Sequence, residues 1–213
     1  MQRDYRTIFG VLLIAGGILI GLQQWGYLKG NWNDALFAGL WALGALYFFD
    51  QARLQNNPWL NFAGLVLAGL AASNLLDLFF PPIGDALGGA VFLGAIGAGF
   101  LFIFRREPSN WWALIPSGVM FTLAIISVLD DLRLDLPFET GGLLFIGIGL
   151  TFLVISQLRT SSEPLGWAIF PAGALILFGL FVSLGSAASW NYVWPVIIIV
   201  VGICLLWQSL RKS

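Results

Sequence analysis

The sequence contains no histidine, and its only cysteine is Cys204. Histidine is the commonest protein ligand of haem and transition metals and the usual proton carrier near neutral pH. Its absence therefore argues against cofactor-bearing proteins. A single cysteine cannot form a disulfide within the chain. We expect no cofactor and no bound metal.

Charge is also scarce. Only 10% of the 213 residues are charged and 59% are hydrophobic, so the chain has more apolar surface than a soluble domain of this size can bury. This composition predicts an all-α integral membrane protein. Crossing a hydrocarbon core takes roughly 20 helical residues. Stretches near that length predict eight transmembrane helices, at residues 5–22, 35–49, 59–76, 86–104, 111–129, 140–157, 166–183 and 192–207.

The basic residues predict an orientation. If eight helices alternate in direction, both termini and the loops after the second, fourth and sixth helices share one side, which holds eight of the ten basic residues. Only Lys29 and Arg133 fall on the other side. Because basic residues collect on the cytoplasmic side, we expect a multi-pass protein of the cell (cytoplasmic) membrane, the bacterial inner membrane, with both termini cytoplasmic. The basic positions that end the even-numbered helices are Arg53, Arg106, Arg159 and Arg211.

The helices recur in pairs with a period near 53 residues, which predicts four tandem hairpins within one membrane domain, residues 1–213. Each unit has an outward helix, a short external loop and a returning helix. The units cover about residues 5–53, 57–106, 109–159 and 164–212. Because each unit begins and ends on the same side, the units are related by an axis along the membrane normal, which disfavours inverted-repeat transporters.

Glycine sets the register of the repeat. Residues 112–118 (WALIPSG) and 167–173 (WAIFPAG) match most closely, and both end on a glycine. Glycine lets helix backbones approach closely where lipid gives no hydrophobic drive for association, so we expect these glycines at helix contacts. The outward helices carry Gly10, Gly64, Gly118 and Gly173, and the returning helices carry Gly44, Gly97, Gly149 and Gly202.

Polar residues gather near the outer ends of two outward helices. Asn74 and Asp77 lie about one turn apart, and Asp130 and Asp131 end the third outward helix. One interpretation is a set of solvated helix ends, and the other is an external site for a cation or a partner. We favour solvated helix ends and treat the four residues as a candidate outer polar site.

Catalytic motifs are missing from the sequence. It has no glycine-rich phosphate loop, nucleophile elbow or metal-spaced cluster, and no charged residue lies clearly at mid-membrane. We therefore expect the chain not to be an enzyme. A noncatalytic scaffold, anchor or accessory subunit is favoured over a small-solute transporter or channel. An intramembrane enzyme acting on lipid is a further alternative, for which Asp77 or the Asp130 and Asp131 pair would have to supply the chemistry.

Two segments resemble a known hairpin. Residues 8–26 (IFGVLLIAGGILIGLQQWG) resemble the first helix of the LiaI/LiaF-like transmembrane hairpin, and residues 190–203 (WNYVWPVIIIVVGI) resemble the second. The two middle units match mainly through their glycine register. The resemblance implies a link to bacterial envelope-stress signalling, as a membrane anchor or inhibitory partner. The soluble C-terminal domain of LiaF-type proteins has no counterpart in this sequence, so regulation through it is not implied.

The short loops leave little surface for soluble partners. We therefore expect association mainly within the membrane, with lipids and with other membrane proteins or a second copy of the chain. We expect no nucleic-acid partner.

Overall fold

The computed structural model describes residues 5–26, 32–132, 140–158 and 165–184, and all regular structure in these ranges is helical. The all-α prediction is confirmed for this part of the chain. Short 3₁₀ helices, Trp111–Ala113 and Leu165–Ala168, lead into α5 and α7. The α-helices in these ranges are α1 (Tyr5–Gln24), α2 (Trp32–Gln55), α3 (Pro58–Phe79), α4 (Pro81–Arg106), α5 (Leu114–Asp131), α6 (Gly141–Ser156) and α7 (Ile169–Leu184).

Five helical segments are long and apolar enough to cross a membrane, so the chain is a multi-pass α-helical membrane protein. The expectation of eight such helices is not met within the described residues. α6 is apolar but has 16 residues, which rise about 24 Å against a core of about 30 Å. α1 is a 20-residue helix outside the five, and residues 192–207 lie outside the described part. The five segments are Ala35–Gln55, Pro58–Phe79, Pro81–Arg106, Trp111–Asp131 and Leu165–Ser183.

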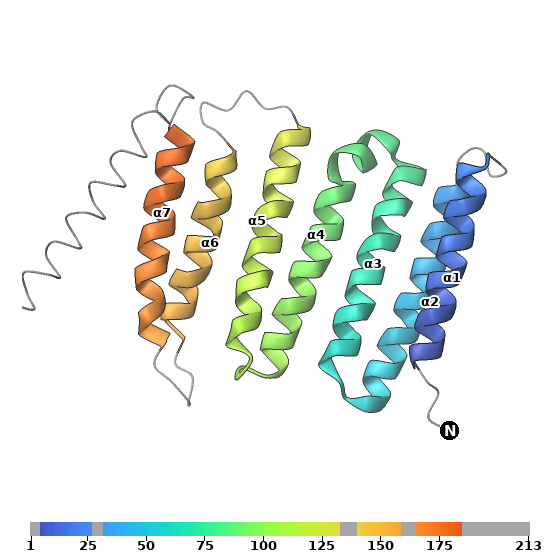
Figure 1. The fold of residues 1–213 in the computed structure, drawn as a ribbon, viewed down its shortest axis with the longest axis horizontal. Coiled ribbons are helices and arrows are strands. Elements are labelled where there is room, and N and C mark those ends of the chain that lie inside the picture. The colour runs from blue at the N-terminus through green and yellow to red at the C-terminus, as the bar shows by residue number, and fades with distance from the viewer. Residues whose placement is uncertain (1–4, 27–31, 133–139, 159–164, 185–213) are drawn as a thin grey trace, which may run out of the picture.

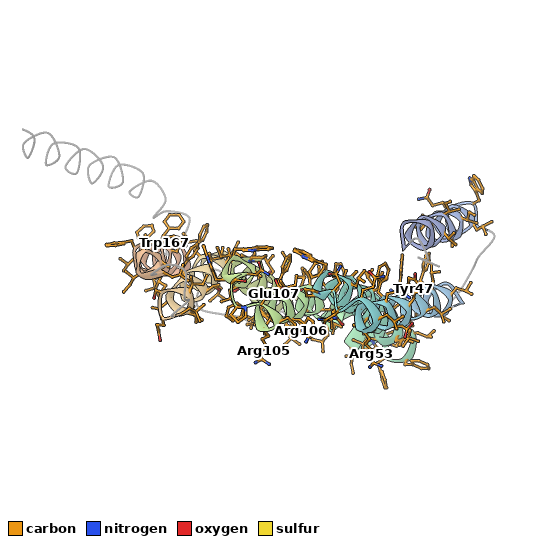
Figure 2. The ribbon with its side chains drawn as sticks, turned by 90° about the horizontal axis from the view of Figure 1, so that it is seen from below. Tyr47, Arg53, Arg105, Arg106, Glu107 and Trp167 are labelled. Atoms are coloured by element: carbon orange, nitrogen blue, oxygen red, sulfur yellow. The ribbon has the colours of Figure 1, made fainter. Side chains whose placement is uncertain are left out.

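The helices stand side by side in a single row that follows the chain order, with α1 and α7 at opposite ends (Figure 1). Each packs mainly against the helices before and after it in the sequence. Seen along the helices, the row is one helix thick from α2 to α7, and α1 is displaced toward one face (Figure 2). The described helices therefore do not close into a ring.

A row one helix thick buries only the flanks of its helices. Large apolar side chains are exposed on every helix, among them Leu43 at 68%, Ile125 at 60% and Leu150 at 51%. In water such surfaces would drive aggregation, whereas in a bilayer the lipid tails cover them at no cost. The helices themselves satisfy their backbone hydrogen bonds, as a membrane requires.

The turns between the middle helices are short and follow from their sequence. Asn56 ends α2 with a φ of 50°, a left-handed conformation that asparagine tolerates better than most residues. Asn57 then caps α3 by accepting a hydrogen bond from the Trp59 N–H at 3.0 Å, and Pro58 occupies the first turn of the helix. At the opposite end, Phe80 alone separates α3 from α4, which begins at Pro81.

Close backbone approach holds neighbouring helices together. A Cβ added to Gly179 on α7 would lie 2.7 Å from the Gly142 carbonyl oxygen of α6, so the two backbones meet at a pair of glycines. A Cβ at Gly69 on α3 would collide with the Ala95 side chain of α4. Such approach lets dispersion contacts replace the missing hydrophobic drive between helices in lipid.

Candidate polar and basic sites at the two ends of the row

The described charged side chains divide between the two ends of the helices. The end that holds Arg53, Arg105 and Arg106 is called the basic end here, and it also carries Asp50 and Glu107. The opposite end is called the acidic end. Its charged residues with described side chains are Asp77, Asp85, Asp130 and Asp131.

Asn74 and Asp77, the α3 part of the candidate outer polar site, lie at the acidic end and are partly buried. Asn74 Nδ2 donates to the Leu70 carbonyl oxygen of its own helix at 2.8 Å. Asp77 packs against the start of α4, where a Cβ at Gly84 would lie 2.6 Å from the Asp77 backbone nitrogen. The Asn74 amide is therefore hydrogen-bonded within its own helix. Asp77 packs against the start of α4, close to the tight turn between α3 and α4.

Asp130 and Asp131, the α5 part of the candidate site, are both exposed. Ser127 Oγ donates to Asp131 Oδ2 over a long 3.4 Å. α4 lies between the two parts, since a Cβ at Gly88 would reach Ser73 Oγ at 2.9 Å and one at Gly89 would reach Ser127 Oγ at 3.2 Å. The structure thus brings the four predicted residues to one end of the row but divides them between two flanks of α4.

No group of three or more histidine, cysteine, aspartate or glutamate side chains suited to a metal ion occurs within the described ranges. The described residues therefore offer no set of ligands for the external cation site that was one interpretation of the sequence.

Two of the predicted basic positions lie together at the basic end. Arg106 Nη2 donates to Asn56 Oδ1 at 2.5 Å, which ties the end of α4 to the α2–α3 turn. Arg53 is exposed one turn before Asn56, and Arg105 is exposed beside Arg106. Figure 2 shows Arg53 and Arg105 extending from the same face of the row. Arg159 and Arg211 lie outside the described residues.

Tryptophan rings meet one another at the basic end. The rings of Trp59 and Trp112 stack with their centroids 6.1 Å apart, and those of Trp111 and Trp167 meet edge to face at 6.1 Å. Trp167 also contacts Phe152 of α6 at 6.2 Å. These rings thus connect segments that lie far apart in the sequence at the basic end.

The recurrent glycines occupy different surroundings. A Cβ at Gly64 would lie 2.8 Å from the Phe49 ring of α2, and one at Gly118 would lie 2.8 Å from Thr151 Cβ of α6. Gly44 is buried. Among the described residues, no atom outside its own helix lies within 4 Å of the position of a Cβ at Gly10 or at Gly173, and Gly202 lies outside the described residues.

Gly97 and Gly149 share one kind of contact with the next helix. A Cβ at Gly97 would lie 3.2 Å from the Ser117 carbonyl oxygen of α5, and one at Gly149 would lie 3.0 Å from the Ala172 carbonyl oxygen of α7. Ser117 and Ala172 directly precede the recurrent glycines Gly118 and Gly173. The buried Ser117 also donates from Oγ to the Gly97 carbonyl oxygen at 2.8 Å, a hydrogen bond between helices.

The sequence did not predict the hydrogen bonds of Ser117 and Asn56 with neighbouring helices, or the buried hydroxyl groups of Tyr47 and Ser183. The Asn-Asn-Pro run at 56–58 was the available signal for a capped turn that receives an arginine. Nothing in the pattern marks Tyr47 or Ser183, whose hydroxyl groups are buried without a hydrogen-bond partner in the described part. Such orphaned groups are uncommon in folded proteins.

Comparison with known proteins yields no matching family model, no matching curated protein and no matching solved structure. A functional proposal for this chain therefore has to stand on its own residues.

Proposed function

We propose that the chain is a noncatalytic membrane scaffold, anchor or accessory subunit, built of four helical hairpins with both termini in the cytoplasm. The observation that carries the proposal is the single row of apolar helices. A row presents two broad faces within the membrane, and a protein whose role is to hold other membrane components needs such surfaces.

The contacts of Gly97 and Gly149 support the repeat. Each receives the carbonyl oxygen just before the glycine of the next outward helix, at 3.2 Å and 3.0 Å from the position of an added Cβ. The same local geometry therefore recurs at the α4–α5 and α6–α7 boundaries. Recurrence of a contact is stronger support for duplication than recurrence of glycine in apolar helices, because apolar sequences resemble one another easily.

The division of charge supports the orientation. Each described arginine side chain lies at the basic end, whereas four aspartates lie at the acidic end. Under the positive-inside rule the basic end faces the cytoplasm.

The row also favours a scaffold over a channel within one chain. A lumen needs helices on all sides, and α1 and α7 lie at opposite ends of the row (Figure 1). The described charged residues lie near helix ends, away from the mid-membrane positions that mark ion pathways and proton relays.

Envelope-stress signalling is the biological setting that we propose, on the resemblance of residues 8–26 and 190–203 to the LiaI/LiaF-like hairpin. In this setting the partner is a signalling protein with its own transmembrane helix. It would bind laterally, against one of the two apolar faces.

Cysteine labelling tests the topology, because Cys204→Ser removes the only native thiol. In that background Gln55→Cys reports on the basic end, and Asp131→Cys reports on the acidic end. We expect a membrane-impermeant maleimide to label intact cells at Asp131→Cys only, and Gln55→Cys only after permeabilisation. Labelling of both ends from outside would refute the proposed orientation.

Photo-crosslinking tests the scaffold role. A photoreactive amino acid at Ile125 or Leu150, both exposed, should capture one discrete membrane protein in cells, whereas the same group at the fully buried Ile103 should react only within the chain. Failure to capture a protein at either exposed position, combined with solute flux in proteoliposomes of the purified chain, would favour the transporter alternative.

A further inference from the structure

Three arginine side chains gather around the α2–α3 turn at the basic end. Arg106, at the end of α4, donates from Nη2 to Asn56 Oδ1 at 2.5 Å. Arg53 lies three residues before Asn56, about one helical turn, and Arg105 directly precedes Arg106. All three arginines are exposed, and Figure 2 shows Arg53 and Arg105 extending from the same face of the row. α2 and α4, which lie on either side of α3, thus bring their positive charges to one turn.

No described carboxylate forms an ion pair with these arginines. Within the described ranges, Arg53 and Arg105 have no hydrogen-bond partner either, and the partner of Arg106 is an uncharged amide. A guanidinium carries five N–H donors, and the bond to Asn56 uses one of those of Arg106. The three side chains therefore keep their charge, and most of their donors, for an anionic ligand.

The two carboxylates described at the basic end lie nearby. Asp50 is exposed about one turn before Arg53. Glu107 Oε2 accepts a hydrogen bond from Asn110 Nδ2 at 2.8 Å, which holds Glu107 against the segment that leads into α5. Three positive charges thus stand beside two negative ones, so the described charge at this end remains positive in sum.

The depth of the turn in the membrane indicates the class of ligand. The spans Ala35–Gln55 and Pro81–Arg106 both end here, so their arginines lie at the level of the lipid phosphates. Leu54 and Trp59, which flank the turn in the sequence, are 72% and 49% exposed. They offer apolar surface to the glycerol and the first methylene groups of a lipid, whereas a soluble anion or an acidic protein segment would leave that surface uncovered.

We propose that the three arginines bind the phosphate of an anionic phospholipid at the α2–α3 turn, and that Asn56 orients Arg106 for it. Arginine can donate two parallel hydrogen bonds to phosphate oxygens, which makes it suited to this headgroup. Phosphatidylglycerol is preferred over phosphatidylcholine, because the choline ammonium group compensates the charge of its own phosphate. The inference goes beyond the scaffold proposal and holds whichever side of the membrane the basic end faces.

Competition between two lipids measures this preference. The purified full chain, titrated with equal amounts of phosphatidylglycerol and phosphatidylcholine, should retain mainly phosphatidylglycerol in native mass spectra. Arg53→Gln, Arg105→Gln and Arg106→Gln should each lower the ratio of the two bound lipids about fivefold, which corresponds to about 1 kcal/mol for a basic residue near an anionic surface. Gln55→Ala is the control, because Gln55 is an exposed, uncharged residue of the same end, and it should leave the ratio unchanged.

Substitutions at Asn56 test the site without removing an arginine. Asn56→Asp gives Arg106 a carboxylate partner that competes with the lipid phosphate, and aspartate tolerates the left-handed φ of 50°. The lipid ratio should fall as far as in Arg106→Gln. Asn56→Gly keeps the turn but removes the amide oxygen, so the ratio should fall less, because Arg106 loses its orientation and keeps its charge.

Four results would overturn the inference. Equal binding of the two lipids by the unmodified chain would leave the arginines to another partner. An unchanged ratio after replacement of all three arginines by glutamine would place the lipid preference elsewhere in the chain. A ratio in Asn56→Gly equal to that of the unmodified chain would show that the arginines act through their summed charge alone. Displacement of phosphatidylglycerol by an equal concentration of glycerol phosphate would identify a site for a soluble anion.

Each of these results leaves the scaffold proposal intact, since that proposal is tested by labelling and photo-crosslinking at other residues.

Discussion

The α3–α4 pair and the α1–α2 pair are both apolar hairpins, yet the first is tightly packed and the second is not. α3 and α4 meet at three levels, through Gly99, Gly69 and Gly84. α1 meets α2 over a short stretch, where Trp41 Cη2 lies 3.6 Å from the position of a Cβ at Gly16. Glycine alone therefore does not bring two helices together, because the facing side chains decide how closely the backbones approach.

Trp41 gives a physical reason for the difference. Its ring contacts the position of a Cβ at Gly16, and among the described residues no atom outside α1 lies within 4 Å of a Cβ at Gly10, Gly17 or Gly21, so we infer that the ring holds the two backbones apart. Trp41 lies three residues before Gly44, one of the recurrent glycines. Three residues before the recurrent glycines of α4 and α6 stand Gly94 and Ile146, which are smaller.

The largest expected effect comes from filling the α3–α4 contact. Gly69→Leu should lower the free energy of unfolding by about 1–3 kcal/mol, because the added side chain overlaps Ala95. Gly17→Leu, the matched change on α1, should cause no loss. Unfolding in mixed micelles by sodium dodecyl sulfate, followed by tryptophan fluorescence, measures both. An equal loss at Gly17 would mean that α1 is as tightly enclosed as α3.

A hydrogen bond between helices should contribute next. Ser117→Ala removes the donor to the Gly97 carbonyl oxygen, and we expect a loss of about 0.6–1.7 kcal/mol in the same assay. Ser156→Ala is the control, because the Ser156 hydroxyl is exposed and donates to Leu153 of its own helix. If both variants unfold alike, the Ser117 bond adds nothing to the packing of α4 against α5.

The tryptophan contacts at the basic end should contribute slightly less to the free energy of unfolding. Trp112→Ala removes the ring stacked on Trp59, and we expect a loss of about 0.5–1.5 kcal/mol beyond the burial term. Trp25→Ala, at the α1 end of the row, changes a ring that is 76% exposed and should have little effect. A double-mutant cycle with Trp59→Ala isolates the contact, and a coupling energy of zero would contradict it.

The smallest effect on global stability is expected at Trp41. Trp41→Ala should leave unfolding of the remaining helices nearly unchanged while changing the amide hydrogen exchange of α1, which depends on local contacts. If the ring holds the helices apart, α1 approaches α2 and its exchange slows. Faster exchange would show that Trp41 instead attaches α1 to the row.

The helical class was predictable because apolar length and scarce charge dictate it. The helix boundaries were less predictable. The helix expected at 86–104 begins at Pro81, because Pro81 and Pro82 fit the first turn of a helix as well as they fit a loop. α6 ends at Ser156, and its 16 residues make it shorter than the helices that are long enough to span a membrane.

The arrangement of the helices was not predictable from their pattern. A glycine marks a place for close approach but does not identify the helix that fills it. A Cβ at Gly118 would meet Thr151, whereas a Cβ at Gly173 would meet no described atom of another helix within 4 Å. The candidate outer polar site illustrates the same limit. Asn74 and Asp77 were placed on one face by helical spacing, but the position of Gly84 against Asp77 depends on the tight turn at Phe80.

Because each helix contacts little beyond its immediate neighbours, the row has no centre that the other helices must fit around. A hairpin gained or lost at either edge would leave the remaining pairings unchanged, as in soluble solenoids, where each repeat depends only on the next. Soluble solenoids need polar capping repeats, whereas a bilayer solvates the apolar faces of the described helices. Each described helix pair is therefore a local unit whose packing does not depend on the length of the row.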